Sequence, residues 1–170
     1  MKLVTYQAHI EAAPRLGVIR DDTVVAELGT HAGLCLPHRM LDFIDLGPVA
    51  LARLQGALQS ARGDCGDASA LPLQNVKLLA PIPRPRKNIF GIGLNYLDHV
   101  AESSKALDTK PDLPQEPVVF SKPPTAVVGP DDPIKHDSNL TQQLDWEVEL
   151  AVIIGTRAHR TPRADALNHV

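Results

Sequence analysis

An apolar run late in the sequence carries two glutamates two residues apart. From Leu144 to Gly155 it is Leu-Asp-Trp-Glu-Val-Glu-Leu-Ala-Val-Ile-Ile-Gly. Side chains alternate faces along a β-strand, so Glu147 and Glu149 would point the same way from a strand that is otherwise apolar on both faces. Such a strand is typical of a sheet covered on both sides. We therefore expect a strand over Leu144–Gly155, with its two carboxylates at the edge of a buried layer.

Two neighbouring carboxylates that are partly removed from water repel each other unless they share a proton or a cation. A hard divalent ion that takes oxygen ligands removes this repulsion. The alternative is an exposed strand face on which both groups are simply hydrated. The pair makes a metal site the first functional hypothesis for this chain.

Composition excludes several function classes. With 44% hydrophobic and 22% charged residues, the 170-residue chain has ordinary globular composition, enough for one domain or for a small domain and part of another. The net charge of −3, with no lysine or arginine cluster, argues against nucleic acid as a partner. Cys35 and Cys65 match neither a zinc spacing nor a disulfide framework. No signal peptide or membrane-length apolar run is visible, so we expect a soluble cytoplasmic protein without a membrane partner.

Residue composition and pattern divide the chain into three regions. Residues 1–72 predict a small α+β cap, and residues 73–86, with alternating prolines at Pro81, Pro83 and Pro85, predict an extended linker. Residues 87–170 alternate short β-rich runs with loops and form the third region. The expected strands are Lys2–Gln7, Leu16–Ile19 and Thr23–Leu28 in the cap, then Asn88–Gly93, Pro117–Lys122, Thr125–Val128 and Leu144–Gly155. The cap should also hold helical segments, one after Pro37 and one through Val49, Leu51, Ala52, Leu54 and Leu58.

The end of the chain suggests a helix that begins at Thr161-Pro162. Its pattern runs to Val170 with no closing signal, and so short a helix is marginal alone. We expect the chain to be an N-terminal fragment of a longer protein. A short terminal helix docked on the sheet is the alternative.

A second chemical motif is Gly-Ile-Gly-Leu-Asn-Tyr-Leu-Asp-His-Val-Ala-Glu from Gly91 to Glu102. It predicts a strand, a tight exit and then a helix, with Asn95 and Asp98 as a capping pair. His99 and Glu102 would share one helix face, where a carboxylate can orient an imidazole for work as a general base. A solvated charged helix face is the alternative. The glycines do not complete a phosphate-binding loop.

The remaining polar residues carry less information. Lys122 at a strand end could bind an anionic substrate or simply be solvated. Asp131-Asp132 after Gly129-Pro130 predicts a turn. Surface positions are expected for three histidines without partners at ligand spacing, namely His136, His159 and His169.

In combination, three ordered motifs resemble the fumarylacetoacetate hydrolase family. They are Gly-x-Gly-Leu-Asn-Tyr-x-x-His-x-x-Glu from Gly91, Pro-Val-Val-Phe-x-Lys-Pro from Pro117, and Asp-Trp-Glu-Val-Glu-Leu-Ala-Val-Ile-Ile-Gly from Asp145. The preceding proline-rich stretch and the cap are similar to those of short bacterial members. The resemblance implies an α+β, mostly β chain, in which the small cap precedes the first part of a mixed β-sandwich or β-roll catalytic domain.

The resemblance also implies roles for particular residues. Glu147 and Glu149 match two of three carboxylate ligands of Mg²⁺ or Mn²⁺, with Ca²⁺ in some members. His99 and Glu102 match a catalytic dyad, and Lys122 matches a recurrent lysine. Asn95 and Tyr96 match without an assigned chemistry. The third ligand, an aspartate, and a later catalytic lysine are expected beyond Val170.

The implied activity is metal-dependent hydrolysis of a carbon–carbon bond in a small 2-oxo or 1,3-dicarbonyl acid such as an acylpyruvate. His99 would activate water, and the metal would stabilise the enolate that leaves. The same enolate serves decarboxylation, isomerisation or hydration, which are the near alternatives. A different class of function is a non-catalytic fragment or an anion-binding module. The full-length protein is expected to be a homodimer.

Overall fold

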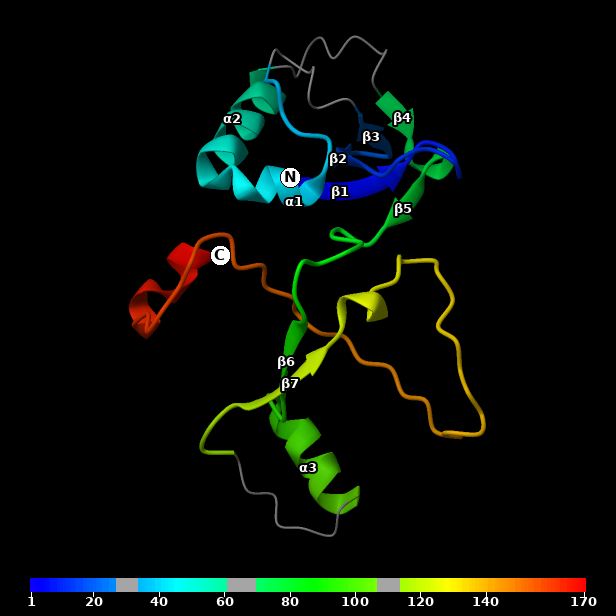
Figure 1. The fold of residues 1–170 in the computed structure, drawn as a ribbon, viewed down its shortest axis with the longest axis vertical. Helices are drawn as coiled ribbons and strands as arrows, with labels where there is room; N and C mark the ends of the chain where they lie inside the picture. The colour runs from blue at the N-terminus through cyan, green and yellow to red at the C-terminus, as the bar shows by residue number, and fades with distance from the viewer. Residues whose placement is uncertain (27–33, 61–69, 107–113) are drawn as a thin grey trace. The chain divides into compact units, whose positions relative to one another are not determined.

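The computed structural model describes residues 1–26, 34–60, 70–106 and 114–170. By their contacts these form two compact units, one made of residues 1–83 with 128–170 and the other of residues 84–127 (Figure 1). No helix in the described ranges is long and apolar enough to cross a membrane. The domain boundaries expected at residues 72 and 86 stay predictions.

The first unit is built on an antiparallel five-stranded sheet with the strand order β4-β3-β2-β1-β5. The strands are β1 (Lys2–Gln7), β2 (Arg15–Arg20), β3 (Thr23–Val25), β4 (Ala70–Pro72) and β5 (Lys77–Leu79). This confirms the strands predicted over Lys2–Gln7 and Leu16–Ile19 and the start of the strand predicted over Thr23–Leu28, whose positions 27 and 28 lie outside the described residues.

The hairpin between β2 and β3 turns at Asp21 and Asp22, because Arg20 pairs with Thr23. Asp21 has a φ of 51°, the left-handed conformation that two-residue hairpin loops require and that aspartate tolerates better than most residues. The Thr23 hydroxyl donates a 2.8 Å hydrogen bond to the carbonyl of Arg20 and closes the turn.

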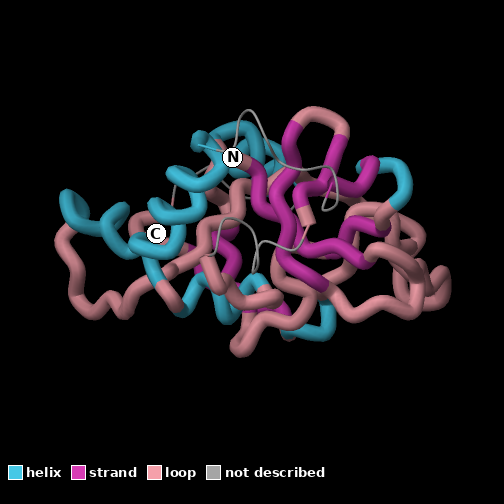
Figure 2. The backbone as a smooth tube through the Cα atoms, turned by 90° about the horizontal axis from the view of Figure 1, so that it is seen from above, coloured by secondary structure: helices cyan, strands magenta, loops and turns pink. Residues whose placement is uncertain are grey.

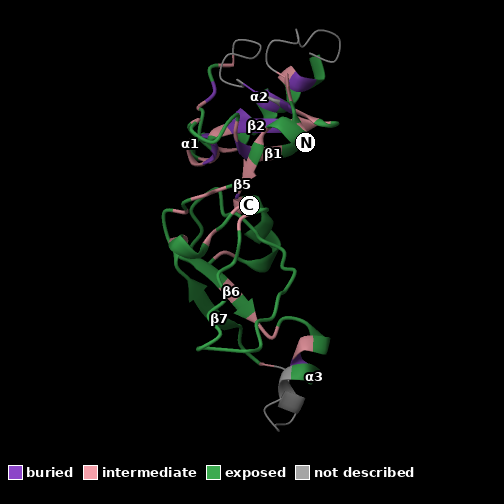
Figure 3. Cartoon of the chain, turned by 90° about the vertical axis from the view of Figure 1, so that its right-hand side faces the viewer, coloured by how far each residue is buried: buried purple, intermediate pink, exposed green. Residues whose placement is uncertain are grey.

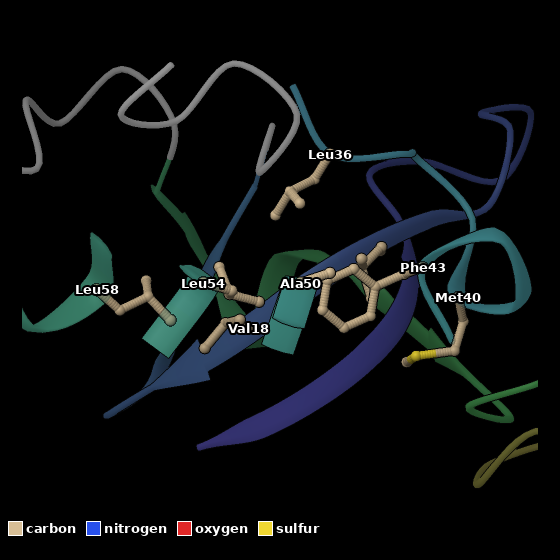
Figure 4. Packing of buried hydrophobic residues seen from close by; sticks show 8 residues of the cluster. Val18, Leu36, Met40, Phe43, Ala50, Leu54 and Leu58 are labelled. Atoms are coloured by element: carbon tan, nitrogen blue, oxygen red, sulfur yellow. The ribbon is translucent and has the colours of Figure 1, made fainter. Parts of the chain in front are cut away.

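Two helices, α1 (Met40–Asp45) and α2 (Gly47–Ser60), cover one face of this sheet (Figure 4). The inward side of α2 presents Ala50, Leu54 and Leu58, which are four residues apart and therefore lie on one helix face. The sequence pattern had also placed Val49, Leu51 and Ala52 in this stripe, but all three are exposed. The buried cluster consists of Leu16, Val18, Leu36, Met40, Phe43, Ala50, Leu54 and Leu58.

A smaller cluster forms around Tyr6, Val24 and Ala26. Ile19 packs against this cluster while its neighbour Val18 belongs to the helix-covered one, as alternation along β2 requires. The sheet therefore buries apolar side chains on both faces.

Residues 128–170 add little regular structure to this unit. The Gly129–Asp132 turn was predicted and is present, since the Asp132 amide donates to the Gly129 carbonyl at 3.2 Å and the Gly129 amide donates to Asp132 Oδ2 at 2.9 Å. Lys77 Nζ of β5 donates to Asp132 Oδ1 at 2.8 Å, which fastens the turn to the sheet.

The strand expected over Leu144–Gly155 is wrong for this structure. Residues 143–155 have no regular secondary structure, and the whole stretch from residue 133 to residue 160 is exposed (Figures 2 and 3). A strand needs a neighbour for its amide and carbonyl groups, and neither sheet of the described residues includes this stretch. Its apolar pattern alone does not make it a strand.

A helical turn does begin after Thr161-Pro162, as the sequence indicated. It is the 3₁₀ segment η5 (Arg163–His169), with Pro162 at its N-cap. The carbonyl of His169 accepts the amides of Gly155 at 2.8 Å and Thr156 at 3.2 Å, so the end of the chain folds back on residues 155–156.

The second unit contains two antiparallel strands, β6 (Ile89–Gly93) and β7 (Val118–Lys122), and the helix α3 (Leu97–Ala106) that follows β6. Both strands were predicted to within a residue at their ends, and the helix predicted after β6 is present, although its end had not been predicted. The strand expected over Thr125–Val128 is wrong, because a 3₁₀ turn, η4 (Pro124–Ala126), stands there instead. Pro123 and Pro124 lack amide hydrogens, and the Ala126 amide donates to the Pro123 carbonyl at 3.0 Å.

Candidate functional site

The turn from β6 into α3 positions the predicted histidine and glutamate. Leu94 has a φ of 54° directly after β6, and the helix begins three residues later at Leu97. His99 is half-buried in the first turn of the helix, next to the buried Val100. Glu102 follows at i+3 and is exposed. The two side chains share a helix side, although no hydrogen bond or ion pair joins them within the described part of the chain.

Lys122 ends β7 in the same compact unit as His99 and is exposed. Its ammonium Nζ lies 5.7 Å from the centroid of the Phe120 ring, two residues back on the same strand. This distance is within the range of a cation–π interaction. Lys122 is thus an exposed lysine beside an aromatic ring, and its binding of an anionic substrate stays a prediction.

Glu147 and Glu149 belong to the other compact unit, on the irregular stretch described above. Both are exposed, as are the apolar residues between and around them. Trp146, Val148 and Leu150 are each more than four-fifths exposed, at 83%, 84% and 83%. The alternation of acidic and apolar residues is present, but the layer that would bury its apolar side is not formed by the described residues.

The donor chemistry of the two glutamates suits a hard divalent cation. Mg²⁺ is commonly held by one or two carboxylates, with water or substrate completing its shell. No group of three histidine, cysteine, aspartate or glutamate residues gathers anywhere in the described ranges. The assignment of Glu147 and Glu149 as metal ligands stays a prediction.

Two of the three remaining histidines predicted at the surface have local polar partners. His136 Nε2 is 2.8 Å from the carbonyl oxygen of Thr141, and His169 Nδ1 is 3.1 Å from the hydroxyl of Thr156. His136 and His159 are exposed, as expected for surface histidines, while His169 is half-buried. We give none of the three a role in the candidate site.

One contact that the sequence reasoning missed lies between Phe120 and Gly91. These residues pair across β6 and β7, and the Phe120 ring occupies the space that a side chain at position 91 would fill. The sequence did contain both residues, in two of the three motifs: Gly91 in the first predicted strand and Phe120 in the second. It could not be used because the register between the two strands was unknown.

The fold is α+β and mostly sheet, and residues 88–170 match the family model described as fumarylacetoacetate hydrolase C-terminal. Residues 88–170 thus belong to the fumarylacetoacetate hydrolase family. This confirms the family expected from the three motifs.

The chain is similar both to proteins named oxaloacetate tautomerase and to a solved fumarylacetoacetate hydrolase. The chain is 36% identical, over its whole length, to 49% of the oxaloacetate tautomerase fahd2, mitochondrial, of Xenopus laevis. It is 47% identical over 98 residues, 58% of the chain, to 31% of the oxaloacetate tautomerase YisK of Bacillus subtilis (strain 168). Among solved structures it resembles a fumarylacetoacetate hydrolase from the psychrophilic Exiguobacterium antarcticum, with a TM-score of 0.65 and 31% identity over 99% of this chain and 52% of that one. The chain thus spans about half the length of the curated relatives it matches.

Proposed function

We propose that this protein converts the enol and keto forms of a small 2-oxo dicarboxylic acid, with oxaloacetate as the first substrate to test. The likeness of the whole chain to the Xenopus laevis oxaloacetate tautomerase, at 36% identity, is the observation that carries this proposal. The shorter but stronger likeness to the Bacillus subtilis oxaloacetate tautomerase, which covers 98 residues at 47% identity, supports it.

The chemistry requires one proton to leave the enol oxygen and one proton to reach the neighbouring carbon. His99 is the candidate for this transfer, because imidazole gains and loses a proton near neutral pH. Its half-buried position on α3 limits how far the ring can move, and Glu102 stands one turn on, where it can orient the imidazole. We assign these two residues the proton transfer and its orientation.

The substrate carries two carboxylates and a carbonyl that becomes an enolate. Lys122 offers a positive charge for a carboxylate. Glu147 and Glu149 supply hard oxygen donors for Mg²⁺ or Mn²⁺, with Ca²⁺ as a further candidate. A divalent cation bound there would supply the positive charge that a developing enolate needs.

Hydrolysis of a carbon–carbon bond in an acylpyruvate-type substrate is the second candidate. The likeness to the Exiguobacterium antarcticum fumarylacetoacetate hydrolase favours it. The chemistry is related, because hydrolysis adds water to a distal carbonyl and expels the rest of the molecule as an enolate. Decarboxylation and hydration would use the same enolate. Homodimer assembly and a cytoplasmic location stay predictions for the whole protein.

The test compares the two reactions in one preparation. The 170-residue chain is assayed, together with the complete protein wherever its coding sequence continues. The first assay follows the ultraviolet absorbance of enol-oxaloacetate as it converts to the keto form, with Mg²⁺, Mn²⁺ or excess chelator. The second follows loss of an acylpyruvate. We expect metal-dependent acceleration of the first reaction.

His99→Ala should lower the tautomerase rate by about 10²- to 10⁴-fold, the usual contribution of a general acid–base group. His159→Ala, at an exposed histidine outside the candidate site, is the matched control and should leave the rate unchanged. Turnover of acylpyruvate alone would establish the second candidate instead. Rates equal to buffer in both assays would refute the enzymatic proposal for the preparation tested and favour the non-catalytic fragment or anion-binding module.

A further inference from the structure

The ladder between β6 and β7 places three residue pairs on one face. Directly opposed residues of an antiparallel pair share a face, and the faces alternate along each strand. One face therefore holds Ile89 with Lys122, Gly91 with Phe120, and Gly93 with Val118. Both glycines of the motif and the candidate lysine lie on this same face.

The Phe120 ring lies across the backbone of Gly91. A methyl group at Gly91 would lie 2.7 Å from both Cε1 and Cε2 of the ring, and closer still to Cζ. These separations are well below the ordinary carbon–carbon contact of about 3.5–4.0 Å. At Gly93 the same methyl group would meet nothing nearer than Val118 Cγ1 at 3.5 Å, an ordinary contact. Of these two glycines, only Gly91 could not accept a methyl group without a shift of the Phe120 ring.

The Phe120 ring also contacts the Lys122 ammonium. Lys122 Nζ lies 5.7 Å from the centroid of the Phe120 ring, and the two side chains share a strand face because they are two residues apart. Phe120 is 44% exposed, so it is not a buried core residue in the described structure. Within the described residues, Gly91 lies beneath the ring and the Lys122 ammonium lies beside it.

We propose that Phe120 is a positioning residue: its ring, seated on Gly91, holds the Lys122 ammonium in place to receive a carboxylate of the substrate. A four-carbon lysine stem otherwise samples many rotamers, and binding an anion would then have to restrict them. The aromatic face limits this freedom in advance and leaves the positive charge intact. The role in substrate binding rests on the proposed function, whereas the contact itself does not.

The contact is tested first without any substrate. In the NMR spectrum of the whole 170-residue chain, the Lys122 ε-methylene protons should be shifted upfield by the ring current of Phe120, and comparison with Lys122→Met assigns the signal. Phe120→Leu should remove the shift and Phe120→Tyr should keep it. Gly91→Ala should change it by displacing the ring, while the matched control Gly93→Ala should not. An unshifted Lys122 signal, or one that survives in Phe120→Leu, would overturn the proposal whatever reaction the protein catalyses.

The role in binding is tested by kinetics with enol-oxaloacetate. Phe120→Leu should raise KM about two- to fivefold, the range that an exposed cation–π contact covers, with little change in kcat. Phe120→Tyr should restore the wild-type KM. In a Lys122→Met background, Phe120→Leu should have no further effect. An equal increase of KM in both backgrounds would show that Phe120 acts without Lys122 and would overturn the positioning role.

If the preparation does not turn over enol-oxaloacetate, oxalate replaces the substrate as a probe. Its binding then tests the positioning role of Phe120 separately from the proposed tautomerase activity. Titration of oxalate into the wild-type chain should move the Lys122 signal, and Phe120→Leu should weaken that binding by the same factor. Failure of turnover with retention of this effect would reject the proposed tautomerase while supporting the positioning role. A Lys122 signal that oxalate moves identically in both proteins would reject the positioning role.

Discussion

Replacement of Gly17 by alanine tests the packing of the five-stranded sheet. Gly17 lies in β2 between two side chains that come from the neighbouring strands on either side. A methyl group there would lie 2.7 Å from Val24 Cγ1 and 3.0 Å from both Cδ1 and Cε1 of Tyr6. These distances fall short of the ordinary carbon–carbon contact by about 0.5–1 Å.

Neither neighbour can retreat easily, because Val24 is 0% exposed and Tyr6 is 2% exposed. An added carbon in a well-packed core typically lowers the free energy of unfolding by about 1–3 kcal/mol. Replacement of glycine by alanine also lowers the entropy of the unfolded chain, which raises the free energy of unfolding by about 0.4–1 kcal/mol. We therefore expect Gly17→Ala to lower the free energy of unfolding by about 1.3 kcal/mol, the difference between the midpoints of these two ranges.

The matched control is the same substitution at Gly56. This glycine lies inside α2, and a methyl group there would have nothing within 4 Å. Alanine is favoured over glycine in a helix interior by about 1 kcal/mol, so Gly56→Ala should raise the free energy of unfolding by about 0.5–1 kcal/mol. One chemical change should thus act in opposite directions at two sites.

Urea denaturation followed by far-ultraviolet circular dichroism measures both variants against the wild-type chain. A double variant with Val24→Ala tests the cause, since removal of Val24 Cγ1 should make Gly17→Ala less costly than it is in the wild-type background. A Gly17→Ala protein as stable as Gly56→Ala would refute the reasoning, as would a cost that the Val24→Ala background leaves unchanged.

Three further changes probe other parts of the first unit. The Lys77 ammonium, bonded to the Asp132 side chain, and then the Gly129 amide hold the pKa of Asp132 below its ordinary value. The wild type should therefore be more stable than Asp132→Asn above the ordinary carboxylate pKa and should lose this advantage as pH falls through the lowered one. Thermal midpoints of both proteins at neutral and acid pH check this, and a difference that does not change with pH would contradict it. Arg20 Nη2 donates a 2.8 Å hydrogen bond to the Leu58 carbonyl in the last turn of α2, so Arg20→Met should cost about 0.5–1.5 kcal/mol in urea denaturation, and no cost would contradict the capping role. Leu54 is 0% exposed, so Leu54→Ala should lower the free energy of unfolding by about 2–5 kcal/mol. Leu51 is 36% exposed, so Leu51→Ala should lower it far less. Equal losses in urea denaturation would contradict the assigned buried face of α2.

The cap could be predicted from sequence because its signals are local. The strands at Lys2–Gln7, Leu16–Ile19 and Thr23 onward were predicted, and the short polar connection between the last two turns with a positive φ at Asp21. The helix α2 was visible from its apolar spacing. Its buried face was not fixed as well, because Val49 and Ala50 are adjacent and only packing against β2 selects Ala50.

The candidate site was predictable in its residues and less so in its contacts. His99 and Glu102 share one helix because their spacing is local, and the structure forms that helix. Their catalytic role, like that of Lys122, stays a prediction. The seat of the Phe120 ring on Gly91 depends on the register of β6 against β7, which joins residues about thirty apart in sequence. No local pattern determines such a register.

The stretch from residue 144 to residue 155 shows where sequence reasoning about strands fails in physical terms. Alternation and an apolar run determine which side chains a strand would bury, but a strand exists only when a neighbour takes up its amides and carbonyls. The described residues provide no such neighbour, and Trp146, Val148 and Leu150 remain more than four-fifths exposed, at 83%, 84% and 83%. Leaving so many large apolar side chains in water is unfavourable by about 1.5–3 kcal/mol for each that could be fully buried. Any surface that pairs with this stretch would therefore gain both hydrogen bonds and apolar burial, and it would at the same time fix the backbone that carries Glu147 and Glu149. The same pairing that would make this stretch a strand would therefore also fix the positions of the proposed metal ligands Glu147 and Glu149.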